Sequence, residues 1–257
     1  GSRNFSFPKN CPSCGSKVVK DFNKISKKYD AVKRCSSEGY KCEKIAIEKI
    51  KHFVSKEAFN IEGLGKKVVE KFWNLKLIKL PYDIFNLNYK NIEKLDGWGK
   101  QSSNNLKKSI EKSRNIELDK FIYSLGIRHI GQENAKTLAG FFISIKEFSK
   151  LFNNEERAEI LKNLLELDGI GATQVESLNN FFINIKNTKI VNNLIKVLNI
   201  KDYSFKNSSG KFSNKRLMFT GGFQNMSRSE AKSIAENNGG KVLGSVSKKL
   251  DILIVGD

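Results

Sequence analysis

The four cysteines of this chain all lie within its first 42 residues and form two pairs. Cys11 and Cys14 are separated by two residues, and Cys35 and Cys42 by six. Thiolates spaced like the first pair can point at one tetrahedral ion, and a second pair can complete its coordination. Because four sulfur ligands leave no open position, the pattern predicts a structural zinc site rather than a catalytic one. Disulfides and unrelated free thiols are the alternatives. Disulfides fit poorly with a chain in which no secretion signal is recognisable.

A short glycine pattern occurs four times further along the chain. It reads Ile61-Glu62-Gly63-Leu64-Gly65 in hairpin 1, and it returns in hairpin 2 (95–99), hairpin 3 (127–131) and hairpin 4 (167–171). Glycines permit backbone conformations that other residues avoid, and they leave no side chain between the main chain and a ligand. Hairpin 3 has His129 in place of its first glycine, which makes it the weakest copy.

Each copy must be positioned by helices, because an apolar residue recurs at helical spacing after it. Seven residues after the last glycine of the four copies stand Phe72, Leu106, Leu138 and Leu178, and four residues after it stand Val69, Ser103, Ala135 and Val175. Helix-like runs also precede the copies, as in residues 156–166. One copy alone would be an ordinary glycine helix cap, but four in-phase copies favour a repeated helix–hairpin–helix unit.

The first amides of a helix that begins at such a glycine lack internal partners and bind phosphate well. Backbone phosphates of a nucleic acid fit this geometry, and such contacts do not read base sequence. A net charge of +19, from 46 Lys and Arg against 27 Asp and Glu, favours the same partner. Compositional drift in a chain rich in Lys, Asn and Ile is the alternative. The predicted DNA contacts are Gly63, Gly65, Lys66, Gly97, Gly99, Lys100, Arg128, Gly131, Gly169 and Gly171.

Lys94-Leu95-Asp96-Gly97 matches the pattern in which nucleotidyltransferases place their nucleophilic lysine. A nucleophilic lysine needs a desolvated pocket and partner groups for the nucleotide, and neighbouring residues supply neither. The same frame at hairpin 4 carries Glu166, so the position is the residue before a hairpin. We therefore expect no catalytic residue in this chain.

The last 57 residues change character. Residues 201–214 have the composition of a linker. A buried strand is expected at 216–220, then a helix that begins at the Ser227–Glu230 capping box and ends near Asn238. Two more strands are expected at 242–243 and 251–255, the last apolar enough to be central in a parallel sheet. One helix and three strands cannot cover both sheet faces, so this domain is expected to be incomplete.

These motifs, in this order, resemble the C-terminal half of a bacterial NAD-dependent DNA ligase. The resemblance rests on the Cys-Pro-Ser-Cys-Gly and Arg-Cys-(six residues)-Cys segments, on His52-Phe53-Val54-Ser55, on the Ile61 and Gly126–Gly131 hairpins, and on the segment from Gly239 to Lys249. It implies a mainly α chain with a four-cysteine zinc finger and connecting helix at 3–60, a four-hairpin helix-hairpin-helix domain at 61–200, a linker at 201–214 and the N-terminal part of an α/β BRCT domain at 215–257.

In the resemblance, Cys11, Cys14, Cys35 and Cys42 correspond to zinc ligands, and the hairpin glycines to those that grip the minor-groove backbone. The family uses NAD and magnesium to seal nicks between a 5'-phosphate and a 3'-hydroxyl in DNA replication and repair. Its adenylation domain has no counterpart here, so the chain alone is expected to be non-catalytic. Nicked double-stranded DNA is the expected partner, with a protein or DNA-end contact through the BRCT domain, no membrane, and a cytoplasmic, nucleoid-associated location in a bacterium. The alternative is a non-enzymatic DNA-repair scaffold whose BRCT-like domain recruits a partner.

Overall fold

The structure is a computed structural model that describes residues 7–23, 27–37, 39–167, 169–204, 210–213, 215–243 and 250–256. The chain forms two compact units, Gly1–Tyr203 and Ser204–Asp257, each with its own hydrophobic core. Helices predominate, so the mainly α fold class is confirmed. Of the segment expected as a linker, residues 205–209 and 214 lie outside the described residues.

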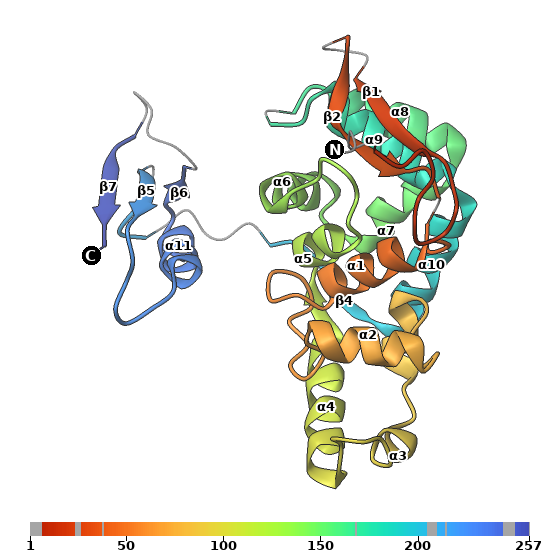
Figure 1. Ribbon diagram of the computed structural model, residues 1–257. Helices are drawn as coiled ribbons and strands as arrows, with labels where there is room; N and C mark the ends of the chain where they lie inside the picture. The colour runs from red at the N-terminus through yellow and green to blue at the C-terminus, as the bar shows by residue number, and fades with distance from the viewer. Residues whose placement is uncertain are drawn as a thin grey trace, which may run out of the picture. The chain divides into compact units, whose positions relative to one another are not determined.

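The first unit begins with an antiparallel ribbon of β1 (Val18–Asn23) and β2 (Lys28–Cys35), followed by α1 (Glu43–Phe53). Helix α1 has the bounds expected from its apolar spacing, and it buries Ala46, Ile47, Ile50 and Phe53. Figure 1 shows the ribbon at one end of this unit and the helices α3 and α4 at the other. Helix α1 therefore connects the ribbon to the helical repeats.

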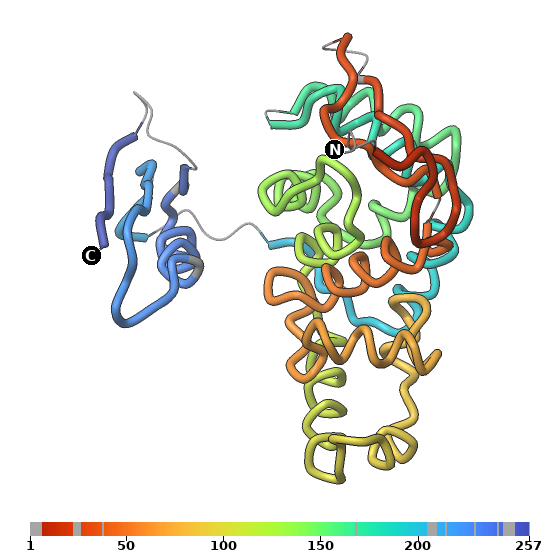
Figure 2. Tube along the Cα trace, in the orientation of Figure 1, coloured from red at the N-terminus to blue at the C-terminus, as the bar shows by residue number. Residues whose placement is uncertain are grey.

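Four helix–hairpin–helix repeats fill the rest of the first unit, and their path can be followed in Figure 2. In every repeat the hairpin ends at the glycine that caps the following helix. The predicted stripe is confirmed, because Phe72, Leu106, Leu138 and Leu178 are all buried. The elements are α2 (Lys66–Asn74), η1 (Pro81–Asn86), α3 (Tyr89–Ile92), α4 (Lys100–Ser113), α5 (Leu118–Ser124), α6 (Gln132–Phe142), α7 (Ile145–Ser149), η2 (Lys150–Phe152), α8 (Asn154–Leu164), α9 (Ala172–Ile183) and α10 (Ile185–Val197).

A short parallel pair of strands closes the repeats. β3 (Asn115–Glu117) lies beside β4 (Asn199–Lys201), and Asn115 is opposite Asn199. The guanidinium of Arg114 donates to the carbonyl oxygens of Phe85 at 2.7 Å and Val197 at 3.0 Å. The chain thus leaves for hairpins 3 and 4 and returns from them at almost the same place.

The second unit contains β5 (Arg216–Thr220), α11 (Arg228–Asn237), β6 (Lys241–Val242) and β7 (Ile252–Val255). The predicted capping box is present, since the Ser227 hydroxyl accepts from the Glu230 amide at 3.2 Å. The described strands are parallel in the order β6-β5-β7. Residues 251–255 were expected to be central, whereas among the described strands β5 is central, and Leu253 and Val255 of β7 are exposed. An apolar run alone does not reveal which face of a strand is covered.

Candidate metal centre and nucleic-acid interface

The four cysteines converge on one point. Their Sγ atoms all lie within 4.8 Å of one another, with Cys11 and Cys42 4.0 Å apart and Cys14 and Cys35 3.4 Å apart. Tetrahedral coordination by sulfur at ~2.3 Å implies sulfur–sulfur distances of about 3.8 Å, so the donor set fits a metal ion. Cys35 ends β2 and Cys42 caps α1, so a bound ion would fasten the ribbon to that helix.

The protonation of these thiols depends on their neighbours. Hydrogen bonds from the side chain and backbone of Ser16 lower the pKa of Cys14 to about 6. The Ser37 amide lowers the pKa of Cys35, but burial and the thiols of Cys14 and Cys11 raise it to about 12. The four thiols therefore cannot all be ionised at this site unless a positive charge compensates them. A metal cation bound by the four sulfurs would supply this charge.

The four hairpins share one backbone geometry. In each, the amide of the fourth residue donates to the carbonyl oxygen of the first, at 3.3, 2.9, 3.1 and 3.1 Å from hairpin 1 to hairpin 4. The third residue has a positive φ in every copy: +91° at Gly63, +77° at Gly97, +60° at His129 and +88° at Gly169. Such a turn normally requires glycine at this position. Asp168 in hairpin 4 lies outside the described residues.

His129 adopts the left-handed conformation that its glycine counterparts adopt. Histidine is among the residues that occur there more often than average, and its Nδ1 lies 3.0 Å from the Ser177 hydroxyl on α9. The buried side chains of Ile127 and Ile130 hold the turn from both sides. Hairpin 3 therefore has the same turn despite its sequence.

The last glycine of each hairpin caps a helix in an extended conformation, with φ of −65° at Gly65, −157° at Gly99, −83° at Gly131 and −106° at Gly171. A Cβ added at Gly65, Gly99 or Gly131 would meet nothing within 4 Å. Neither backbone conformation nor internal packing requires glycine at these three positions. The missing side chains leave the first turns of α2, α4 and α6 open to a ligand from outside.

Hairpins 1 and 2 pack on each other's helices. Gly63 of hairpin 1 lies against Leu106 of α4, 3.4 Å from the place a Cβ would occupy. Trp98 of hairpin 2 lies against Phe72 of α2, with ring centroids 5.4 Å apart. Leu106 and Phe72 hold equivalent positions, seven residues after their capping glycines, so the contacts are reciprocal. The bond between His129 and Ser177 joins hairpin 3 to the helix of hairpin 4 in a similar way.

The predicted cationic contacts differ in their surroundings. Lys66 and Lys100 are exposed beside their hairpins. Arg128 is bound by the ribbon instead, because its guanidinium donates to the carboxylates of Asp21 and Asp30, the second at 2.6 Å. Arg34 also donates to Asp30, at 2.7 Å. The sequence analysis did not predict that either aspartate contacts Arg128. Both lie too far from Arg128 along the chain for any local pattern to connect them.

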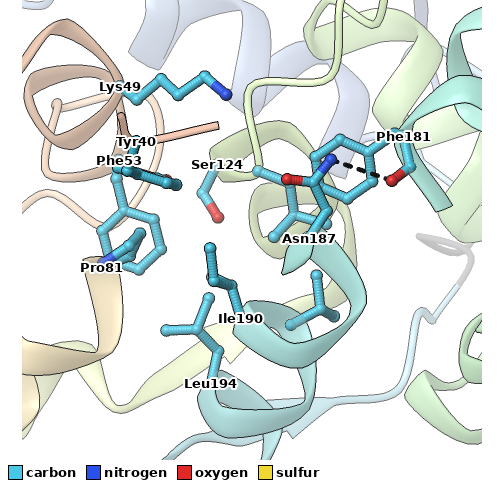
Figure 3. A pocket seen from close by; sticks show the side chains of 11 residues that line it. Tyr40, Lys49, Phe53, Pro81, Ser124, Phe181, Asn187, Ile190 and Leu194 are labelled. Atoms are coloured by element: carbon cyan, nitrogen blue, oxygen red, sulfur yellow. Dashed lines mark hydrogen bonds between the residues drawn. The ribbon is translucent and has the colours of Figure 1, made fainter. Parts of the chain in front are cut away.

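Neither described cavity suits a nucleotide. One cavity, lined by the side chains drawn in Figure 3, has a volume of about 10 Å³, room for one water molecule. In its lining the Nζ atom of Lys49 lies 5.2 Å from the centre of the Tyr40 ring. Burial lowers the pKa of Lys49 and raises that of Tyr40. A hollow of 280 Å³ elsewhere has Phe142 and Ile160 in its lining together with Glu156 and Glu159. These carboxylates disfavour phosphate. Lys94 is exposed and lines neither cavity.

Comparison with known protein families identifies two kinds of domain in this chain. Residues 120–191 match the family model of the helix-hairpin-helix motif, and residues 207–257 match that of the BRCA1 C Terminus (BRCT) domain. The chain therefore combines helix-hairpin-helix repeats with a BRCT domain and a four-cysteine cluster. None of the described helices is long and apolar enough to span a membrane.

Individual relatives match over nearly the whole chain. The chain is 56% identical over 256 residues to a DNA ligase of Pelagibacter ubique, covering all of this chain and 37% of the relative. It is 38% identical over 283 residues to a DNA ligase of Azorhizobium caulinodans, covering all of this chain and 38% of the relative. A DNA ligase of Rickettsia bellii is 42% identical over 261 residues, with 98% and 37% covered. The chain resembles the C-terminal part of these DNA ligases, and it spans a little over a third of their length.

Proposed function

We propose that this chain binds the backbone of nicked duplex DNA without reading its sequence, as part of an NAD-dependent DNA ligase. The observation that supports it most is the set of capping glycines Gly65, Gly99 and Gly131, where neither a positive φ nor a close neighbour excludes a side chain. Glycine is one of several residues that can cap a helix, and a phosphate that approaches the amides of the helix N-terminus favours glycine over the others, because a side chain there would stand in its way.

The reciprocal packing of hairpins 1 and 2 fixes two helix N-termini relative to each other, and hairpins 3 and 4 provide a second pair. Each N-terminus binds one stretch of backbone, and Lys66 and Lys100 add charge-assisted contacts. Gly63, Gly97 and Gly169 shape the turns that carry these contacts, and Gly171 caps the helix of hairpin 4. Because only phosphates are bound, the chain holds the duplex in register without selecting a sequence.

In this proposal the chain does not catalyse joining on its own. The whole ligase uses NAD and magnesium to join a 5'-phosphate to a 3'-hydroxyl in DNA replication and repair, and the residues of that reaction lie in other domains. The chain keeps the nick in place while they act. Such a protein works in the bacterial cytoplasm, on the nucleoid.

The metal in this proposal is zinc, held by Cys11, Cys14, Cys35 and Cys42 in a structural role. The domains are a zinc finger with its connecting helix at 3–60, a DNA-binding helix-hairpin-helix domain at 61–200, a linker at 201–214 and a BRCT domain from 215. The BRCT domain is proposed to contact a protein or a DNA end.

The test is a binding titration of nicked and intact duplexes of two unrelated base sequences over a salt series. The logarithm of the affinity should fall linearly with the logarithm of the salt concentration. Six to ten phosphate contacts would cost roughly 10³ to 10⁵ in affinity between about 50 and 200 mM salt. The two sequences should bind equally well. Binding that ignores salt, or that prefers one sequence strongly, would overturn the proposal.

A further inference from the structure

The ribbon of β1 and β2 has two faces with different chemistry. Side chains of successive strand residues point to opposite faces. Asp21 and Asp30 both bind Arg128 of hairpin 3, so their face of the ribbon is turned toward the helical repeats. Their neighbours Phe22 and Tyr29 consequently point away from the repeats.

Phe22 and Tyr29 form an exposed aromatic pair. They are direct cross-strand partners, and their ring centroids lie 4.9 Å apart with an interplanar angle of 59°. Phe22 is 49% exposed and Tyr29 67% exposed, and neither belongs to the hydrophobic core of the first unit. Pairing across the ribbon explains why the rings touch, but it does not explain why two large rings face water.

Lysines accompany this pair. Lys20 and Lys33 are cross-strand partners on the same ribbon, both exposed, and Lys28 directly precedes Tyr29. The pairing register shifts between Lys20 and Phe22, so the lysine pair directly adjoins the aromatic pair along the ribbon at this irregularity. Like charges placed directly opposite each other destabilise a strand pair. The arrangement therefore disfavours the isolated ribbon and favours an anionic ligand.

We infer that the outer face of the ribbon binds unpaired nucleobases of DNA, which stack on Phe22 and Tyr29 while Lys20 and Lys33 hold the adjoining phosphates. Aromatic rings beside a cationic groove are the usual means of binding single strands, and stacking tolerates any base. An apolar protein surface would remove water from the charged lysines without pairing their charge, which costs free energy. A phosphate pairs with that charge. The inference rests on the proposed function, because it takes DNA as the partner, but it adds a site separate from the hairpins.

The experiment uses the full chain and a short single strand that carries the fluorescent base 2-aminopurine. Stacking on the rings should quench its fluorescence. Phe22→Leu with Tyr29→Leu, which keeps apolar bulk but removes both rings, should weaken binding about tenfold or more and abolish the quenching. Phe22→Tyr with Tyr29→Phe should retain both. Lys20→Gln should flatten the dependence of binding on salt.

Zinc content and circular dichroism of each variant establish that the ribbon is intact. Equal single-strand affinity of the double leucine variant and the unchanged chain, or absent quenching, would overturn the inference. A variant with Gly65→Ala and Gly99→Ala separates it from the proposed function. It should lose nicked-duplex binding while it keeps single-strand quenching. Loss of both in this variant would mean that the ribbon is not a separate site.

Discussion

The two glycines of hairpin 1 are present for different physical reasons. Gly63 has a φ of +91° and lies against Leu106, so the fold itself requires it. Gly65 has an ordinary φ of −65° and faces open space. Sequence alone shows two similar glycines, whereas the structure shows that the fold constrains Gly63 and leaves open space at Gly65.

This difference predicts different effects of two alanines. Gly63→Ala should lower the free energy of unfolding by about 1–2 kcal/mol, because alanine avoids a left-handed backbone. Gly65→Ala should lower it less, since alanine is only a poorer helix N-cap than glycine and restricts the unfolded chain, yet it should weaken binding of nicked DNA. Urea unfolding and a DNA titration on both variants measure this. Unaltered DNA affinity of Gly65→Ala would contradict the role of the open helix N-terminus.

Arg128 was predicted to contact DNA. Its ion pairs with Asp21 and Asp30 allow a test, because two explanations of its role predict changes in DNA affinity of opposite or of equal direction. If Arg128 binds phosphate in competition with these carboxylates, Asp21→Asn with Asp30→Asn should raise DNA affinity while Arg128→Gln lowers it. If Arg128 only positions the ribbon, both changes should have the same effect. We expect the first result, because the loss of both carboxylates releases the guanidinium of Arg128 to bind a phosphate. Titrations at one fixed salt concentration decide between the two.

Arg157 is a buried cation that donates hydrogen bonds to neutral oxygens. It is 5% exposed and donates to the carbonyl oxygen of Leu151 at 3.0 Å and to the side chain of Asn179 at 3.2 Å. Arg157→Met would leave these oxygens buried without donors, so it should cost about 2–4 kcal/mol in the free energy of unfolding. Lys162→Met, on the exposed side of the same helix, is the control and should change it by less than about 0.5 kcal/mol. Equal effects would show that the network around Arg157 is dispensable.

Among the secondary-structure elements, the sequence predicted the bounds best where several local signals agree. Helix α1, strand β5 and helix α11 have bounds close to those expected, because apolar spacing and the Ser227 cap act within a few residues. The ribbon was not predicted as strands, since polar residues occupy both of its faces. The three-residue strands β3 and β4 are too short for any periodicity.

The finger should depend on its metal more than the repeats do. The ribbon contributes none of the core residues of the first unit, which begin at Ala46. We expect a chelator to release one zinc ion per chain and to unfold the ribbon, while most of the helical circular-dichroism signal remains. Cys42→Ser should behave like chelation, and Ser36→Ala, which changes an exposed residue beside the cysteines, should not. A collapse of the helical signal on chelation would contradict this separation.

At the scale of the whole chain, the two units have separate hydrophobic cores. The chain should therefore unfold in two calorimetric transitions. Leu217→Ala should lower the midpoint of only one of them, and Leu138→Ala only the other, because each removes a fully buried side chain worth about 2–5 kcal/mol. A single transition that responds to both substitutions would mean that the units fold as one.

The glycines and cysteines of the candidate site were visible in the sequence because the chemistry of each motif is local. The contacts between motifs were not visible. Arg128 meets Asp21 and Asp30, and Gly63 meets Leu106, only because the repeats pack on one another and on the ribbon. No spacing rule connects positions so far apart in the chain.

The parallel pair of β3 and β4 has a mechanical consequence. When tension pulls on the chain beyond Tyr203, β4 passes part of it sideways to β3, where the Asn199 amide also donates to the Arg114 carbonyl oxygen at 2.8 Å. The load then reaches α4 directly, in parallel with the longer path through α10. Hairpins 3 and 4 lie in the segment between β3 and β4, which this connection bypasses. A force applied to the BRCT domain therefore need not distort these hairpins or weaken a ligand bound to them.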